Sequence, residues 1–144
     1  MVCQALEVVD PAHRLFYEQN RDQYLQKLRA LDERIRHKLK PYKGEAFLIF
    51  HPALGYYAQA YHLKQIPVEV DGKSPTSKQL AALIKFAAAH QLKTIFVPKQ
   101  SGTLMARSVA EAIGGQILEI DPLAPAYIEN LDWITDQLCI SFKK

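Results

Sequence analysis

The chain has 144 residues and a formal net charge of +3, which is the size of one ordinary domain with charges of both signs interspersed. So weak a positive charge, without a basic stripe interleaved with aromatic residues, argues against nucleic acid as a partner. No apolar run approaches the roughly 20 residues of a membrane span, and the chain opens without a signal peptide. Taken literally this is a cytosolic protein; the alternative is a piece of a longer protein whose export signal lies upstream.

Two helices are predicted before the first strand. Apolar residues at helical spacing predict a short helix from Val2 to Val9. Asp10-Pro11 then provides an N-cap and a proline at the first helical position, and the helical pattern runs on to about Leu39. A helix of that length is a rod of roughly 40 Å, which suits a strut between two bodies. We therefore treat residues 1–43 as an N-terminal helical segment and residues 44–144 as an α/β lobe.

Within the lobe, short apolar runs alternate with helical patterns. This alternation predicts a four-stranded parallel sheet with helices on both faces, preceded by the long N-terminal helix. The expected strands are 46–50, 66–70, 94–97 and 116–120, and the expected helices are 54–61, 76–90, 103–113 and 125–142. The two cysteines, Cys3 and Cys139, stand near opposite ends of the chain and are expected to be small buried apolar residues rather than a disulfide.

Two of the predicted strands end in a possible metal ligand that is followed at once by proline. The first strand delivers His51 before Pro52, and the last delivers Asp121 before Pro122. Ligands of open α/β sheets bind beyond the carboxyl ends of the strands, so both side chains are expected at one edge. A neutral imidazole and a carboxylate there make half of a Zn²⁺ or Mn²⁺ coordination shell.

His51 and Asp121 also have simpler interpretations that involve no metal. A histidine after an apolar strand is more often a hydrogen-bonded core or turn residue, and Asp121 would serve equally as a helix cap. Glu69 and Asp71, at the end of the second strand, are interpreted as solvated turn residues. No phosphate-binding glycine loop and no GxSxG nucleophile motif is present, so an enzyme that uses His51 as a general base lacks a candidate nucleophile.

The residues around both ligand candidates resemble a known family. The run from Phe50 to Ala58, the segments 61–66 and 74–76, and the run from Leu118 to Leu123 are similar to the C-terminal lobe of zinc/manganese ABC-transporter substrate-binding proteins. Upstream, Asp10-Pro11 and the aromatic and leucine residues that follow resemble the long backbone helix of that family. The resemblance implies two α/β lobes joined by a rigid helix, with metal held between them.

Carried onto this chain, the resemblance implies that His51 and Asp121 are the two metal ligands of the C-terminal lobe. Histidine at the His51 position goes with zinc in the family, and glutamate with manganese, so Zn²⁺ is the expected cargo and Mn²⁺ the less favoured one. The N-terminal lobe, with its two further ligands, is not found in this sequence. The chain also departs from the family at Pro98-Lys99-Gln100, where Glu-Pro-Gln is usual, and at His62, where glycine is usual.

The resemblance implies a transport protein rather than an enzyme. The parent protein would be periplasmic or lipid-anchored outside the cell and would pass metal to the permease subunit of an ABC transporter. Because the long helix would lose contacts with a missing lobe, we expect it to mediate homo-oligomer formation. The alternative is a degenerate or truncated lobe that serves as a structural or interaction module without metal binding.

Overall fold

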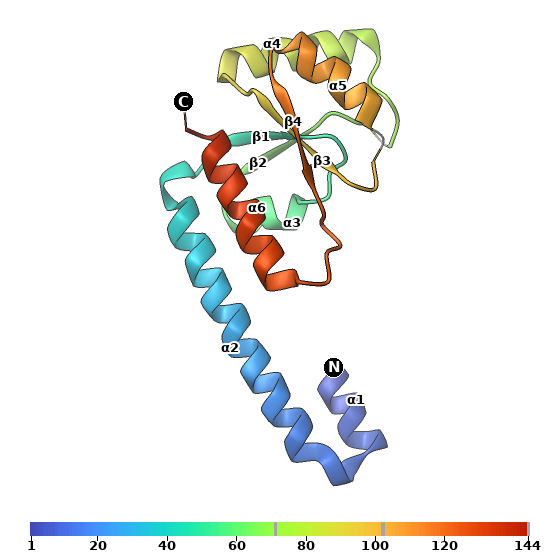
Figure 1. Cartoon of the computed structure of the whole chain (residues 1–144), viewed down its shortest axis with the longest axis vertical. Coiled ribbons are helices and arrows are strands. Elements are labelled where there is room, and N and C mark those ends of the chain that lie inside the picture. The colour runs from blue at the N-terminus through green and yellow to red at the C-terminus, as the bar shows by residue number, and fades with distance from the viewer. Residues whose placement is uncertain (71, 102, 144) are drawn as a thin grey trace.

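The computed structural model describes residues 1–70, 72–101 and 103–143, and it has the predicted α/β architecture (Figure 1). The helices are α1 (Val2–Val9), α2 (Arg14–Leu39), α3 (Gly55–Ala60), α4 (Ser77–His90), α5 (Thr103–Ala112) and α6 (Tyr127–Ser141). Two 3₁₀ turns, η1 (Pro11–His13) and η2 (Lys40–Tyr42), flank α2. The strands are β1 (Ala46–Ile49), β2 (Lys64–Pro67), β3 (Thr94–Pro98) and β4 (Gln116–Ile120).

The four strands form one parallel sheet in the order β2-β1-β3-β4. Successive side chains of a strand point to opposite faces, and the two central strands are apolar on both. Phe47 and Ile49 join a core with α2, α3 and α6, whereas Ala46 and Leu48 join a second core with α4 and α5. The prediction of helices on both faces is therefore confirmed (Figure 1).

Helix α2 is buried at one end and exposed at the other. Its C-terminal half inserts Leu31, Ile35 and Leu39 into the core beside α6. Lys38 adds ion pairs from its Nζ to the carboxylates of Asp132, at 2.8 Å, and Asp136, at 2.6 Å. The N-terminal half extends away from the sheet and carries α1 against its side (Figure 1).

The proposed boundary between residues 43 and 44 remains a prediction, and the core runs across it.

The apolar side chains of α1 and of the outer half of α2 are largely exposed. No residue of α1 is buried. The exposed apolar residues in this part of the chain include Val2, Leu6, Val8, Val9, Leu15, Phe16, Tyr24 and Leu25. Between the two helices lies a largely apolar hollow of about 390 Å³ lined by Val2, Cys3, Leu6, Tyr17, Asn20, Arg21 and Tyr24. None of the described helices is long and apolar enough to cross a membrane.

Three local predictions need correction or completion. The second strand begins at Lys64, two residues before the predicted start, because the pairing with β1 begins there on an exposed sheet edge where polar side chains are tolerated. Asp10 stands at the predicted N-cap position, but its carboxylate makes no capping bond and instead accepts hydrogen bonds from Tyr17 and His13. Both cysteines are free and half-buried, at separate places in the fold.

Candidate metal centre

A hollow of about 570 Å³ lies at the carboxyl ends of the strands, where the sequence places its candidate ligands. It sits where the chain order of the strands reverses between β1 and β3, which is the usual position for ligands in open α/β sheets. Its lining includes His51 and Glu69 from one side and Gln100, Pro122 and Leu123 from the other. The sheet topology therefore creates this hollow from four separate loops.

His51 lies two residues beyond the end of β1 and pairs with a carboxylate that was interpreted from the sequence as a solvated turn residue. Its Nδ1 lies 2.8 Å from Oε2 of Glu69. The backbone holds the pair in register, because the N–H of Glu69 donates to the carbonyl of Phe50 at 3.1 Å. The Glu69 side chain is only 19% exposed, so its interpretation as a solvated turn residue is wrong. The imidazole is 54% exposed and lines the hollow.

Asp121 follows β4 and is held by two donors. Its Oδ1 accepts one hydrogen bond from Nε2 of Gln100 at 3.0 Å and another from the backbone N–H of Leu123 at 3.1 Å. The amide of Gln100 first, and the N–H of Leu123 next, hold the pKa of Asp121 below its usual range. The carboxylate is therefore ionised at neutral pH, as a metal ligand must be.

His51 lines the hollow, whereas Asp121 adjoins it through Gln100 and Leu123, two lining residues that donate hydrogen bonds to its carboxylate. Strands β1 and β4 are separated by β3 alone, so their ends lie roughly 10 Å apart. A cation shared by the side chains of His51 and Asp121 would have to lie over the end of β3, between the ends of β1 and β4. Within the described ranges, no group of three or more His, Cys, Asp or Glu side chains is arranged to hold a metal ion. His51 and Asp121 therefore stay two candidate ligands, and the described residues bring no third one beside them.

Glu69 and Gln100 are two residues of the candidate site that sequence reasoning missed or left without a role. The available signal was position, because both lie just beyond strand ends that converge on one edge. Asp71, named with Glu69 at the sequence level, lies outside the described residues. Among the other histidines, His13 is bonded to Asp10, and His90 is bonded to the carbonyl of Phe86.

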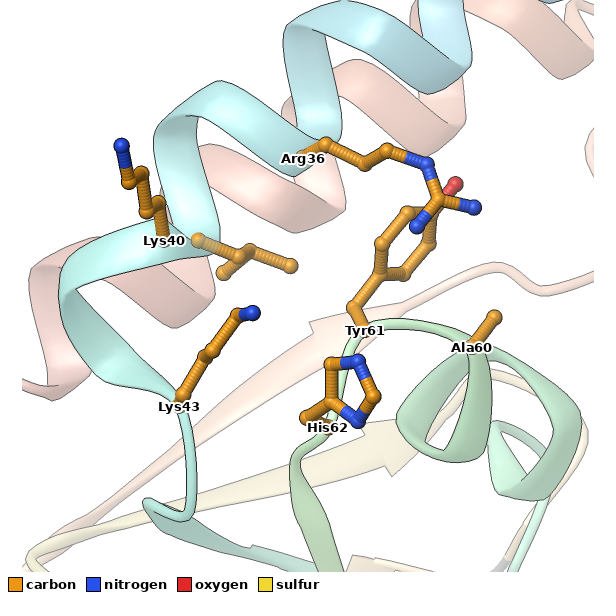
Figure 2. Close-up of a pocket in the computed structure, with 7 residues that line it drawn as sticks. Arg36, Lys40, Lys43, Ala60, Tyr61 and His62 are labelled. Carbon is orange, nitrogen blue, oxygen red and sulfur yellow. The ribbon is translucent and has the colours of Figure 1, made fainter.

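A second hollow, of about 190 Å³, lies at the opposite edge of the sheet, near the amino ends of β1 and β2. Its lining includes Arg36, Lys40, Lys43 and His62. Figure 2 shows Lys40 directed away from the hollow and Arg36 lying over the ring of Tyr61. Arg36, Lys40 and Lys43 lie at the C-terminal end of α2, where positive charge offsets the helix dipole. We therefore interpret these basic side chains as stabilising the end of α2.

His62 stands where the family resemblance implies glycine, and its backbone has a conformation that glycine favours. His62 has φ of +58°, in the left-handed region where glycine is preferred. Its carbonyl accepts a hydrogen bond from the N–H of Gly44 at 2.7 Å. The loop therefore keeps a left-handed backbone at a histidine.

Comparison with known proteins assigns the family. The model of the family described as zinc-uptake complex component A, periplasmic (ZnuA), matches residues 1–139. The chain belongs to the ZnuA family. The high-affinity zinc uptake system protein ZnuA of Bacillus subtilis (strain 168) is 32% identical to it over 125 residues. That alignment covers 85% of this chain and 39% of the relative.

Solved ZnuA structures have the same fold. A crystal structure of ZnuA superposes with a TM-score of 0.94 at 31% identity, over 99% of this chain and 56% of that chain. A ZnuA deletion mutant solved with zinc bound gives a TM-score of 0.93, again at 31% identity, over 99% of this chain and 55% of that one. The family resemblance and the fold class drawn from the sequence are confirmed. The chain spans about 40% of the Bacillus protein and just over half of each solved ZnuA chain.

Proposed function

We propose that this chain provides half of a zinc-capture site, with His51 and Asp121 as two of four ligands. The observation that carries the proposal is one hollow at the carboxyl edge of the sheet, which His51 lines and which Asp121 adjoins through its hydrogen bond with Gln100. Zn²⁺ prefers imidazole nitrogen together with carboxylate oxygen and takes four ligands when its site is closed. The remaining two ligands would come from a second lobe across the hollow.

Zinc is the proposed cargo for two reasons. The imidazole of His51 suits the borderline Zn²⁺ ion better than the harder Mn²⁺ ion, which favours oxygen ligands. The Bacillus relative is named for high-affinity zinc uptake, and one similar ZnuA structure was solved with zinc bound. The metal is carried rather than used in a reaction, so we propose a transport role and no enzymatic activity.

The proposed parent protein works outside the cytoplasm. The family description names a periplasmic component of a zinc-uptake complex. We propose that the parent receptor, in the periplasm or lipid-anchored outside the cell, releases Zn²⁺ to the permease subunit of an ABC transporter. Release requires a site that opens, and ligands divided between two lobes provide one, because separating the lobes breaks the coordination shell.

Calorimetric titration with Zn²⁺ tests the ligand assignment. We expect one weak site per chain in the wild type, because two ligands bind far less tightly than four. His51→Ala and Asp121→Ala should each abolish it. The matched control is His90→Ala, which removes an exposed imidazole bonded only to a backbone carbonyl. Binding that survives both ligand substitutions unchanged would refute the proposal.

We also propose that the exposed apolar surface of α1 and the outer half of α2 supports self-association. A helix as short as α1 is marginal alone, and its apolar residues find no buried place in the described chain. Sedimentation velocity should show dimers or larger species in the wild type. These species should dissociate in the double variant Leu6→Lys/Tyr24→Lys. The control Leu104→Lys alters an exposed apolar residue on α5 and should not dissociate them. A monomer at every concentration would contradict the proposal.

A further inference from the structure

We infer that Glu69 is a positioning residue that selects which nitrogen of His51 binds the metal. The inference rests on the zinc site proposed above and extends it to one atom of the imidazole. An imidazole can bind a metal through either ring nitrogen, and the hydrogen bond made by the other nitrogen decides which one is available.

The hydrogen bond between the two side chains has only one chemically consistent direction when Glu69 is ionised. A carboxylate accepts hydrogen bonds and cannot donate one, so Nδ1 of His51, 2.8 Å from Oε2, must carry the proton. In the neutral imidazole, Nε2 then has the free lone pair. No hydrogen bond of Nε2 to another described side chain or backbone group is present. Nε2 is therefore the nitrogen that Glu69 leaves for a cation.

Backbone hydrogen bonds hold His51 and Glu69 next to each other. Beyond the paired strands, the N–H of Val68 donates to the carbonyl of Ile49, and the N–H of Glu69 donates to the carbonyl of Phe50. This continues the ladder to the residue just before His51. Glu69 is also mostly buried, and His51 is its only ion-pair partner in the described part of the chain.

Glu69 also adds negative charge next to the proposed ligand. A carboxylate hydrogen-bonded to a metal-binding imidazole makes the imidazole a better donor and orients its ring. Loss of such a partner typically weakens metal binding about 10- to 100-fold. Glu69 therefore stabilises bound Zn²⁺ through His51 without touching the ion.

Nitrogen-resolved NMR of the histidine rings tests the inference in metal-free protein, at about pH 8 where imidazoles are neutral. We expect His51 to be protonated at Nδ1 in the wild type. This proton should shift towards Nε2 in Glu69→Ala and stay largely at Nδ1 in Glu69→Gln, because the glutamine carbonyl oxygen can still accept. A wild-type His51 protonated at Nε2 would overturn the inference, even if Zn²⁺ binds.

Zinc titrations of the same variants complete the test. Glu69→Ala should lower the affinity about 10- to 100-fold, and Glu69→Gln should lower it less. Glu111→Ala, which removes an exposed carboxylate on α5, should not change it. Equal affinity in the wild type and Glu69→Ala would overturn the positioning role. Equal, severe losses in Glu69→Ala and Glu69→Gln, with the Nδ1 proton retained in Glu69→Gln, would instead make Glu69 a direct ligand and also overturn it. If Nδ1 is protonated as expected but no variant binds Zn²⁺, the proposed function fails and the hydrogen-bond assignment stands.

Discussion

Gln100 donates a hydrogen bond from Nε2 to Oδ1 of Asp121 across 3.0 Å, and this bond links the ends of β3 and β4. The N–H of Leu123 donates to the same oxygen. Oδ1 is thus occupied by two donors, which leaves Oδ2 as the oxygen better placed to take a cation. The bond with Gln100 therefore orients Asp121 much as Glu69 orients His51.

Gln100→Ala is expected to weaken Zn²⁺ binding about tenfold, at the lower end of the range for partners of metal ligands. The reason is the loss of the amide that fixes the Asp121 carboxylate. Calorimetric titration measures the change, and Gln26→Ala, on the exposed surface of α2, is the control. An unchanged affinity in Gln100→Ala would show that Leu123 alone is enough to orient Asp121.

Ile35→Ala is expected to lower the free energy of unfolding by roughly 2–5 kcal/mol. Ile35 is fully buried where α2 packs on the lobe, so its truncation leaves a cavity. Urea denaturation measures the effect. Lys27→Ala, which alters an exposed polar residue of the same helix, should change the free energy by less than about 0.5 kcal/mol. Similar losses in both variants would mean that the loss does not come from the cavity at Ile35.

Thr76→Ala is expected to cost about 1 kcal/mol of stability through loss of a helix cap. Thr76 Oγ1 accepts from the N–H of Gln79, and Gln79 Oε1 accepts from the N–H of Thr76 at 2.8 Å, which together form a capping box. Thr76→Ser keeps the hydroxyl and should retain most of the stability in thermal unfolding. If serine and alanine were equally destabilising, the methyl group rather than the cap would be responsible.

Asp132 is expected to contribute to stability above about pH 4 and to lose this contribution in acid. The hydrogen bond from Lys38 first, and the positive charges of Lys38 and Arg34 next, lower the pKa of Asp132. The unfolded chain, with an Asp pKa near 3.9, then takes up a proton before the folded chain does as the pH falls. Stability is therefore lost as the pH drops from about 4 through the lowered folded-state pKa.

Asp132→Asn should flatten this acid limb of the stability curve, measured by urea unfolding between about pH 2 and pH 7. At neutral pH the pair is partly exposed, so the loss should stay within about 1 kcal/mol. Glu33→Gln, which alters an exposed carboxylate of α2, is the comparison. Identical acid limbs in the wild type and Asp132→Asn would show that the pKa of Asp132 does not cause the loss of stability in acid.

The elements with strong local signals were predicted from the sequence. The last strand, 116–120, is confirmed residue for residue, because Gly115 and the Asp-Pro pair bound a short segment that contains Ile117, Leu118 and Ile120. Helix α4 begins at Ser77, one residue after its predicted start, and ends at His90 as predicted. The edge strand β2 was misplaced because an exposed edge carries polar residues that read as a turn.

The partners of the candidate ligands could not be found from the sequence. Glu69 lies 18 residues from His51, and Gln100 lies 21 residues from Asp121. Only the register of β2 on β1, and of β3 on β4, decides which side chains meet beyond the strand ends. The sequence identified which residues lie at this edge, but the pairing depends on side-chain directions that no local pattern specifies.

Anomalous scattering at the zinc absorption edge, from a crystal grown with Zn²⁺, tests the central claim most directly. We expect an anomalous-difference peak about 2.0–2.2 Å from both Nε2 of His51 and a carboxylate oxygen of Asp121. Zinc bound only at His13, His37, His62 or His90, with nothing between His51 and Asp121, would contradict it.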